Sequence, residues 1–364
     1  MNDIKNDKRI VMTLDAGGTN FVFSAIRGLN SIVEPITLPS NGTDLDKCLN
    51  SIITGFKEVE KMLPEKAVAI SFAFPGPADY PNGIIGDLGN LPAFRDGVAL
   101  GPMLQEIFGL PVFINNDGDL FAYGEAIAGL LPEVNSMLKG IGSPKQYKNI
   151  FGVTIGTGFG GGLVYNNQLY IGDNSAAAEI WLMRNFIDNK VFAEEGASIR
   201  AVQRVYKQIS GDDANLSPKE IFDIADGKLK GNKSAALKAF EQLGIVIGDA
   251  LANAVTLTDS IIVIGGGLAN AWKFFAPSML STLNGEISTL GGDSVDRLEM
   301  KAFSLEDDEG RKALSKGSLT KIKVPLSDKM VDYDSMKRIG VGLSRLGTSQ
   351  AVSVGAYAFA LSKL

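Results

Sequence analysis

The chain has 364 residues, 45% of them hydrophobic, and a formal net charge of -6, and its length favours two or three domains. Its Lys and Arg residues are scattered, which argues against nucleic acid or an anionic membrane surface as the partner. It contains no histidine, so Ser-His-Asp catalysis, Cys-His catalysis and zinc sites that need imidazole are excluded. Any general base is therefore Asp, Glu, Lys or Tyr, and a carboxylate is the expected choice.

Redox chemistry and localisation follow from the same composition. The only cysteine, Cys48, excludes an intrachain disulfide and is expected to be a small core residue. No apolar stretch approaches transmembrane length, and residues 1–8 lack the apolar core of a signal peptide. We therefore expect a cytoplasmic protein.

The first half of the chain is expected to begin with a three-strand meander and to continue with alternating helices and strands. Apolar runs and alternating patterns predict strands over residues 9–15, 20–27, 31–38, 68–73 and 112–116. Apolar residues at helical spacing predict a helix over residues 44–63. Residues 74–92 form a long loop between two of the strands, and long ordered loops usually carry function.

The turn between the first two strands reads Asp15-Ala16-Gly17-Gly18-Thr19-Asn20. Its glycine pair lets backbone N–H groups approach an anion without obstruction by side chains, and Thr19 adds a hydroxyl. Asp15 offers a carboxylate where a magnesium ion bridging nucleotide phosphates would bind. A tight turn that is Gly-rich by chance is the alternative interpretation, but these parts suit phosphoryl transfer.

A second glycine turn strengthens this interpretation. It contains Gly156, Thr157 and Gly158, and it aligns with the first turn because segment 154–158 matches segment 13–17. The chain thus repeats a strand, glycine turn, strand unit once in each half. Neither turn fits the P-loop pattern or the dinucleotide-binding fingerprint, so we expect two facing turns that grip a nucleotide's phosphates from both sides.

The second half is predicted to be rich in helices and to return to the first domain at its end. Residues 284–335 are charged and rich in Gly and Asp, with strands expected at 298–303 and 322–325. The other expected elements are a helix over 119–128, a helix-rich block over 196–257, a strand over 260–264, a helix over 269–283, a strand over 340–346 and a helix over 349–361. We expect a small domain of residues 1–117 with 349–364, and a larger domain of residues 118–348 with an insertion at 284–335.

A carboxylate follows the strand that ends near residue 116. Asn116 and Asp117 lie where an apolar strand ends and a helix begins, and open α/β sheets place ligand chemistry at the carboxyl ends of their strands. The plainer interpretation is that Asp117 or Asp119 caps the helix. Asp117 is accordingly a candidate both for a position near the cap and for the general base.

These parts, in this order, resemble the ROK family of sugar kinases and regulators, within the actin, hexokinase and Hsp70 ATPase superfamily. The resemblance spans nearly the whole chain. Segments 15–20 and 156–162 are similar to the two phosphate motifs, 75–77 with 90–91 to the sugar loop, 116–117 to the pair with the catalytic aspartate, and 264–267 to the adenosine motif. The fold that it implies is α/β, with two actin-like (ribonuclease H-like) ATPase domains and a cleft between them.

The resemblance implies ATP-dependent phosphorylation of a hexose, at the 6-hydroxyl of glucose or a related sugar, with ATP and Mg²⁺ as cofactors and Asp117 as the general base. It also favours a homodimer. The residues implied to hold the sugar are Asn90, Asn116, Asp117, Glu179 and Glu194. Those implied to bind the nucleotide are Asp15, which also holds magnesium, and Gly17, Gly18, Thr19, Asn20, Gly156, Thr157, Gly158, Gly265, Gly266 and Gly267.

Departures from the family pattern bear on this site. Leu182 stands where the Glu-x-Gly-His motif of the family has a histidine that contacts the sugar and often binds zinc, and residues 189–198 replace the Cys-rich zinc loop, so no zinc is expected. Asp119 replaces a common asparagine. The assignment of Glu194 rests on its spacing to a serine four residues later, and the adjacent Glu195 is the alternative contact.

Three alternatives remain. A kinase for an N-acetylated hexosamine, mannose or fructose would change only the substrate, because the sugar loop and Leu182 shape the pocket. A catalytically inactive sugar-binding or regulatory protein is suggested by Leu182 and Asp119, whereas the intact Asp15, Asp117 and glycine turns argue against it. A transcriptional repressor of the family needs an N-terminal helix-turn-helix, for which the strand that starts by Arg9 leaves no room.

Overall fold

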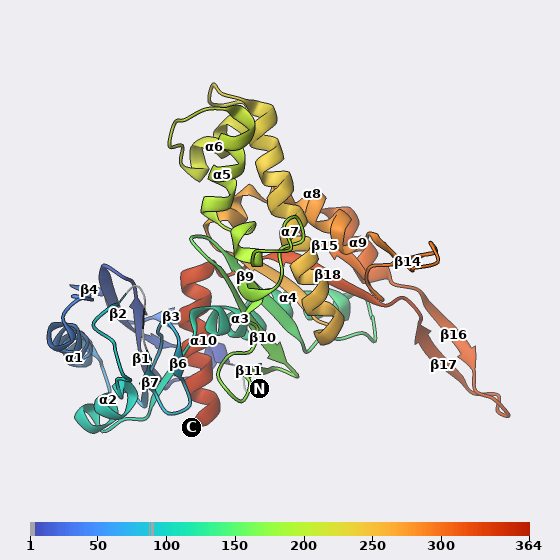
Figure 1. The fold of residues 1–364 in the computed structure, drawn as a ribbon. Coiled ribbons are helices and arrows are strands. Elements are labelled where there is room, and N and C mark those ends of the chain that lie inside the picture. Colours follow the sequence, from blue (N-terminus) through green and yellow to red (C-terminus); the bar gives the residue numbers. More distant parts are fainter. Residues whose placement is uncertain (1–3, 87, 89–90) are drawn as a thin grey trace. The chain divides into compact units, whose positions relative to one another are not determined.

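The computed structural model describes residues 4–86, 88 and 91–364, and the chain divides into two compact units (Figure 1). Unit 1 comprises Met1–Gly129, Gly162–Ala177 and Leu346–Leu364, and unit 2 comprises Leu130–Gly161 and Ala178–Arg345. This division lies after residue 129 rather than after residue 117, and it adds residues 162–177 to the first unit.

Unit 1 is built on a mixed sheet with the strand order β3-β2-β1-β5-β8, in which β4 also pairs with β2. Strand β1 runs parallel to β5, and β5 parallel to β8, whereas β2 is antiparallel to its neighbours. The elements are η1 (Ile4–Asn6), β1 (Ile10–Ala16), β2 (Asn20–Arg27), β3 (Asn30–Ser31), β4 (Ile36–Pro39), α1 (Leu45–Met62), β5 (Ala69–Ala73), β6 (Ala78–Asp79), β7 (Ile84–Ile85), α2 (Leu100–Phe108), β8 (Val112–Asn115), α3 (Asp117–Ile127) and α10 (Thr348–Lys363).

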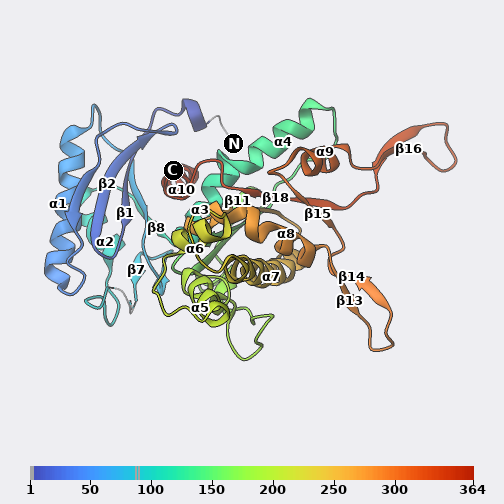
Figure 2. The same cartoon turned by 90° about the horizontal axis from the view of Figure 1, so that it is seen from above.

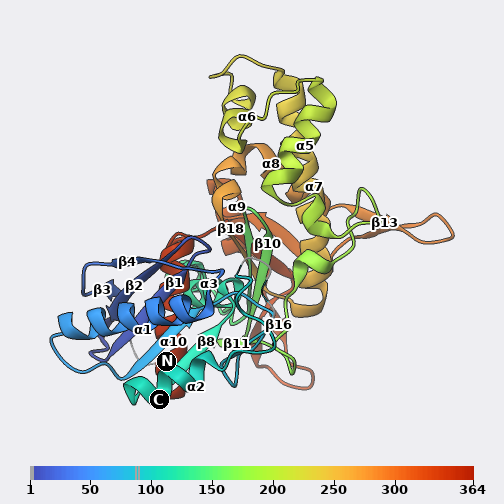
Figure 3. The same ribbon diagram turned by 60° about the vertical axis from the view of Figure 1, so that its left-hand side comes forward.

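Helix α1 covers one face of this sheet (Figures 2 and 3). The side chain of Asp44 accepts a hydrogen bond from the Lys47 N–H and caps the start of the helix. Cys48, Ile52 and Phe56 recur at helical spacing and are fully buried against the sheet. Burial raises the pKa of Cys48 to about 11, so this thiol is a core group, as expected, and not a nucleophile.

Helix α10 covers the opposite face of the same sheet (Figure 2). Tyr357 is buried against Val11 and Ala69. Its hydroxyl donates to the Arg9 carbonyl at 3.1 Å and accepts from the Gly28 N–H at 3.0 Å. Because a buried tyrosine hydroxyl needs a hydrogen-bond partner, these two bonds anchor the C-terminal helix to the first strands of the chain.

Helix α3 packs against α10 so closely that glycine is required at two positions. A Cβ atom at Gly124 would lie 2.0 Å from the Ala351 carbonyl oxygen, and one at Gly355 would lie 2.0 Å from the Leu120 carbonyl oxygen. This close pairing places α3 in the first unit, although the sequence pattern had assigned residues 118–128 to the second domain.

The second sheet has the order β11-β10-β9-β12-β18-β15; β9, β12, β18 and β15 belong to unit 2, whereas β11 and the end of β10 lie in segment 162–177, which is assigned to unit 1. Strands β9, β12, β18 and β15 are parallel. Helices α5 and α6 pack on the long helix α7. The elements are α4 (Leu130–Gly140), β9 (Ile150–Ile155), β10 (Phe159–Tyr165), β11 (Gln168–Tyr170), η2 (Ile180–Leu182), η3 (Ala193–Glu195), α5 (Ile199–Ser210), α6 (Pro218–Ala225), α7 (Lys233–Thr258), β12 (Ile261–Gly265), η4 (Gly267–Ala271), α8 (Trp272–Leu283), β13 (Glu286–Ser288), β14 (Ser294–Asp296), β15 (Lys301–Ser304), α9 (Asp308–Lys316), β16 (Leu319–Lys323), β17 (Met330–Asp334) and β18 (Arg338–Leu343).

Residues 284–335 are partly core and partly projecting. The hairpins β13–β14 and β16–β17 extend away from unit 2 (Figures 1 and 2), while β15 between them joins the sheet beside β18. The two strands expected at 298–303 and 322–325 are present at Lys301–Ser304 and Leu319–Lys323. Among the described residues, no helix is long and apolar enough to cross a membrane.

Some sequence expectations are wrong. The single strand expected over 31–38 is two short strands, β3 and β4, because Pro35 between them cannot donate a ladder hydrogen bond. Helices α2 and α4 were not expected; each carries a proline in its first turn, Pro102 and Pro132, where proline is tolerated. Part of the long loop over 74–92 forms the small ribbon of β6 and β7.

The two sheets share one arrangement. In the first, the hairpin β1–β2 and strand β3 are followed by the parallel strands β5 and β8; in the second, the hairpin β9–β10 and strand β11 are followed by the parallel strands β12 and β18. The repeat predicted from segments 13–17 and 154–158 is therefore confirmed, since each segment lies at the first strand and turn of its hairpin.

The glycine contacts between α3 and α10 generate a first prediction. Alanine usually stabilises a helix interior relative to glycine by about 1 kcal/mol. Gly124→Ala and Gly355→Ala should instead lower the free energy of unfolding by about 1–3 kcal/mol, because each new methyl group overlaps a backbone oxygen. Urea unfolding measures the change. Gly140→Ala in α4, where a Cβ meets no atom within 4 Å, is the matched control and should show no loss; a stabilised Gly355→Ala variant would contradict the packing.

Candidate active site

The parallel strands of unit 1 bring carboxylates to one edge of its sheet. Asp15 near the end of β1 pairs with Ala73 at the end of β5, which pairs with Asn115 at the end of β8. The chain passes from β8 directly into Asn116 and Asp117. Asp15 and Asp117, which are far apart in sequence, therefore lie at the same carboxyl edge, the place where open α/β sheets hold their ligands.

The start of α3 differs from the expectation. Asn116, not Asp117 or Asp119, is the N-cap, because its side-chain oxygen accepts the Gly118 N–H at 2.8 Å. Asp117 is the first helical residue, and its own carboxylate accepts the same N–H at 2.9 Å. Asp119 is buried in the first turn. Asp117 is exposed at the sheet edge.

The surroundings of Asp117 favour its protonated form. Although the residue retains exposed surface, the protein around it removes part of its hydration, and this desolvation raises the pKa of the Asp117 carboxyl above its ordinary value. The negative charge of Asp15 acts in the same direction, whereas the hydrogen bond from the Gly118 N–H opposes it. Such a carboxyl is a better proton acceptor than an ordinary aspartate.

The first glycine turn is held from behind by Ser40. The Ser40 hydroxyl donates to the Gly18 carbonyl at 2.6 Å, and the Ser40 N–H donates to the Thr19 carbonyl at 2.9 Å. In a trans peptide the C=O and N–H point in opposite directions, so the Thr19 N–H points away from Ser40. A Cβ at Gly17 would lie 2.9 Å from the Asn20 oxygen, whereas a Cβ at Gly18 would meet no atom within 4 Å, so open space lies beside this turn.

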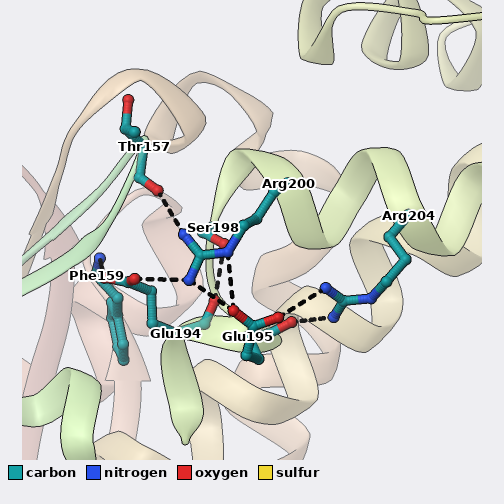
Figure 4. Close-up of polar contacts among 7 residues, drawn as sticks. All are labelled: Thr157, Phe159, Glu194, Glu195, Ser198, Arg200 and Arg204. Atoms are coloured by element: carbon teal, nitrogen blue, oxygen red, sulfur yellow. Dashed lines mark hydrogen bonds and ion pairs between the residues drawn. The ribbon is translucent and has the colours of Figure 1, made fainter.

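The second glycine turn is held in the same way by the start of α5 (Figure 4). The Ile199 N–H donates to the Gly156 carbonyl at 2.8 Å, and Arg200 Nη1 donates to the Thr157 carbonyl at 3.3 Å. The N–H groups of Thr157 and Gly158 therefore point away from α5, and within the described part of the chain neither has a hydrogen-bond acceptor. Two adjacent N–H groups of this kind form a site that suits an anion.

A third glycine turn lies beside the second. Gly265 at the end of β12 pairs with Thr154 in β9, so both strands end at the same edge of the sheet. Gly266 has φ +86°, and a Cβ there would lie 2.4 Å from the Ile155 oxygen, so no larger residue fits. A Cβ at Gly267 would meet nothing within 4 Å, which leaves room for a ligand.

The adjacent residues Glu194 and Glu195 have different partners (Figure 4). Glu194 Oε2 accepts the Phe159 N–H at 2.9 Å, so this carboxylate touches the second glycine turn. Glu195 is paired with Arg200 at 2.8 Å and Arg204 at 3.0 Å, and the hydrogen bond from Arg200 lowers the pKa of its carboxyl. The structure thus separates the two candidates for the sugar contact: Glu194 lies on the turn, and Glu195 is held by two cations.

Glu179 lies next to the segment of Glu194 in unit 2. Its carboxylate accepts the Trp181 indole N–H, and the Trp181 ring packs edge-on against Phe192 with 5.6 Å between ring centroids. Leu182, at the family's histidine position, is 58% exposed, so this apolar side chain has no packing role in the core. Its exposure is consistent with a surface that a ligand contacts.

Two residues important to this geometry were missed by the sequence analysis. Ser40 and Arg200 hold the two glycine turns through backbone carbonyls, and nothing in their local sequence indicates that contact. The position of Ser40 directly after a strand that pairs with β2 is the one available signal. Asn90, assigned to the sugar loop, lies outside the described residues. In the part of the chain that the structure describes, no group of three or more His, Cys, Asp or Glu side chains is placed to hold a metal ion.

Comparison with known proteins identifies the family. The sequence model of the ROK family matches residues 11–310, so the chain belongs to the ROK family. A glucokinase from Parabacteroides distasonis of known structure is 52% identical, with complete coverage of both chains and a TM-score of 0.93. An N-acetyl-D-glucosamine kinase from Vibrio cholerae is 29% identical over 276 residues, 70% of this chain and 83% of that protein. A ROK hexokinase from Thermus thermophilus, 18% identical, shares the fold with a TM-score of 0.66 over 97% of this chain and 99% of that chain.

These comparisons bear on three expectations. The family inferred from the glycine turns and from Asn116-Asp117 is confirmed. The α/β fold with two actin-like, ribonuclease H-like domains is confirmed as well. The predicted class of enzyme, a sugar kinase, is confirmed by the relatives.

The raised pKa of Asp117 generates a second prediction. Because the folded-state pKa lies above the ordinary value of 3.8, ionised Asp117 lowers the stability of the ligand-free protein. This loss is complete above the folded-state pKa, shrinks as pH falls through it, and vanishes near 3.8. Asp117→Asn should therefore raise Tm at pH 7, with a gain that disappears in acid, even though a carboxylate favours the start of a helix.

The double variant with Asp15→Asn is the control for this prediction. Since the charge of Asp15 adds to the shift, Asp117→Asn should stabilise the protein less in the Asp15→Asn background. Calorimetry across pH gives both comparisons, and an Asp117→Asn variant less stable than the parent at pH 7 would refute the electrostatic account.

Proposed function

We propose that the protein is an ATP-dependent hexose kinase that phosphorylates the 6-hydroxyl of glucose or a related hexose, with Asp117 as the general base. The observation that carries this proposal is the exposed Asp117 carboxylate at the carboxyl edge of its sheet, with a raised pKa. The glucokinase relative supports glucose as the substrate. The relative that acts on N-acetyl-D-glucosamine supports an N-acetylated hexosamine as the second candidate.

Polar side chains are proposed to hold the sugar and to take its proton. Asp117 accepts the proton of the sugar hydroxyl while the hydroxyl oxygen forms a bond to the γ-phosphorus. The bond between this phosphorus and the ADP oxygen breaks on the opposite side, in line with the attack. Asn116 uses its side-chain oxygen for the helix cap, so its NH₂ group remains to donate to a sugar hydroxyl. Glu179 and Glu194 accept hydrogen bonds from other hydroxyls, and each carboxylate has lone pairs left after its contacts within the chain.

The phosphates of ATP are bound by backbone N–H groups. Thr19 in the first turn, and Thr157 and Gly158 in the second, donate to phosphoryl oxygens and stabilise the charge that develops on them. The turn at Gly267 receives the adenosine. Asp15 would hold magnesium, because it is an exposed carboxylate next to the first turn and carboxylate oxygens are the ligands that this ion prefers. Bound magnesium would neutralise negative charge on the phosphates.

The proposal extends to metal content and assembly. We expect no stoichiometric zinc, because the chain has no histidine and only one cysteine. Elemental analysis that finds one zinc per chain would refute this. We also propose a cytoplasmic homodimer, as the family resemblance suggests. A catalytically inactive sugar-binding protein is the alternative of another class, and hexose-dependent release of ADP decides between the two.

The third prediction concerns the base. Asp117→Asn keeps the shape of the side chain but cannot accept a proton, so kcat should fall on the order of 10² or more while the affinity for sugar is largely retained. A coupled assay of ADP release gives kcat, and calorimetry gives the sugar affinity. A variant that turns over within about threefold of the parent would remove Asp117 from the mechanism.

The fourth prediction concerns specificity at Leu182. A histidine that binds sugar hydroxyls disfavours analogues that lack them by roughly 1–3 kcal/mol, because its polar atoms are left unpaired. Leucine has no such atoms. Values of kcat/KM for 2-deoxyglucose and N-acetylglucosamine should therefore lie within about tenfold of that for glucose. A kcat/KM for 2-deoxyglucose a thousandfold below that for glucose would contradict this prediction. It would mean that another polar residue binds the 2-hydroxyl, since such a difference is well above the usual contribution of one group.

A further inference from the structure

Arg200 contacts two parts of the proposed site at once (Figure 4). Its Nη2 donates to Glu194 Oε1 at 2.7 Å, and its Nη1 donates to the Thr157 carbonyl at 3.3 Å. The same guanidinium binds the Glu195 carboxylate through Nε at 2.9 Å. One side chain at the start of α5 therefore joins a proposed sugar contact to the second glycine turn.

The bond to Thr157 determines the direction of a group that matters for nucleotide binding. The carbonyl of Thr157 and the N–H of Gly158 belong to one trans peptide and point in opposite directions. With the carbonyl held on Arg200, the Gly158 N–H is directed to the other side of the turn. The Gly156 N–H donates to the Gly158 carbonyl at 2.9 Å and closes the turn, whereas the Thr157 carbonyl itself is held by Arg200. Because glycine at position 158 imposes little restriction on the backbone, loss of the Arg200 bond should loosen this peptide. The preceding peptide has a separate constraint, the bond from the Ile199 N–H to the Gly156 carbonyl.

Glu194 contacts both the second glycine turn and Arg200. Its Oε2 accepts the Phe159 N–H at the end of the glycine turn, while its Oε1 accepts Arg200. A Cβ atom at Gly158 would lie 2.8 Å from Oε2, which shows how closely this carboxylate approaches the turn. Any ligand that shifts Glu194 therefore acts on the turn directly, and also through Arg200.

We propose that Arg200 is a positioning residue that holds the second glycine turn in its anion-binding form and couples it to Glu194. The identity of the two ligands, ATP at the turn and sugar at Glu194, rests on the proposed function. Exposed ion pairs contribute little to global stability, and Arg200 is 43% exposed. Loss of Arg200 should accordingly affect the turn and the nucleotide, and not the fold.

Arg204 is a matched control on the same helix. It lies one turn after Arg200, it is 41% exposed, and it also pairs with Glu195 at 3.0 Å. Its contacts do not include Glu194 or the glycine turn (Figure 4). Arg200→Ala and Arg204→Ala thus remove the same charge from the same helix, and only the first removes the proposed link. Arg200→Lys keeps the charge but loses the planar fork that reaches two acceptors.

The experiment measures KM for ATP, kcat, sugar affinity and amide hydrogen exchange over residues 156–160 in the three variants. Arg200→Ala should raise KM for ATP on the order of tenfold, as expected for the loss of one charged hydrogen bond. It should also speed exchange in residues 156–160 while Tm stays close to that of the parent. Arg204→Ala should match the parent in every measurement, and Arg200→Lys should lie between the two.

Each outcome decides the proposal. Equal KM for ATP in Arg200→Ala and Arg204→Ala, or equal exchange over residues 156–160, overturns it. If the parent shows no hexose kinase activity, the proposed function fails. The role of Arg200 is then tested by the affinity of each variant for a magnesium complex of a non-hydrolysable ATP analogue, measured in place of KM. On the order of tenfold weaker binding by Arg200→Ala alone then supports the role of Arg200, and equal binding by both variants refutes it.

Discussion

The hydrogen-bond register of β1, β5 and β8 is the constraint on which the rest of the site depends. It aligns Asp15 with Ala73 and Ala73 with Asn115, so the chain leaves β8 at the same edge of the sheet as Asp15, two strands away from it, and enters α3 at Asp117. A slip of one residue would turn every side chain of a strand to the other face of the sheet. Val11 and Met12 are buried on opposite faces, and the close packing of such side chains opposes that slip. The position of the two carboxylates on one edge of the sheet is thus a consequence of core packing.

The two glycine turns are held in the same way in both halves of the chain. In each glycine turn, carbonyl groups are held by a neighbouring segment, Ser40 in one half and the start of α5 in the other, and the N–H groups are directed to the opposite side. The two halves therefore share the orientation of the peptides in the glycine turn as well as the sequence pattern. The residues that hold the turns differ, because each half recruits whichever segment lies behind its own turn.

Local patterns predicted much of the fold and little of the support around the site. The strand over 20–27 and the helix α1 follow from periodicity, and the glycine turns with Asp117 follow from composition and order. Whether Glu194 or Glu195 touches the turn cannot be read from two identical neighbouring side chains, since only their partners differ. The cap by Asn116 and the role of Arg200 depend on backbone positions that no local pattern encodes.

The dependence of kcat/KM for the hexose on pH tests the central claim most directly. If Asp117 is the base, the rate falls in acid with the pKa of that carboxyl, which lies above the ordinary 3.8. A rate that stays constant as pH falls to the ordinary pKa of aspartate would contradict the account.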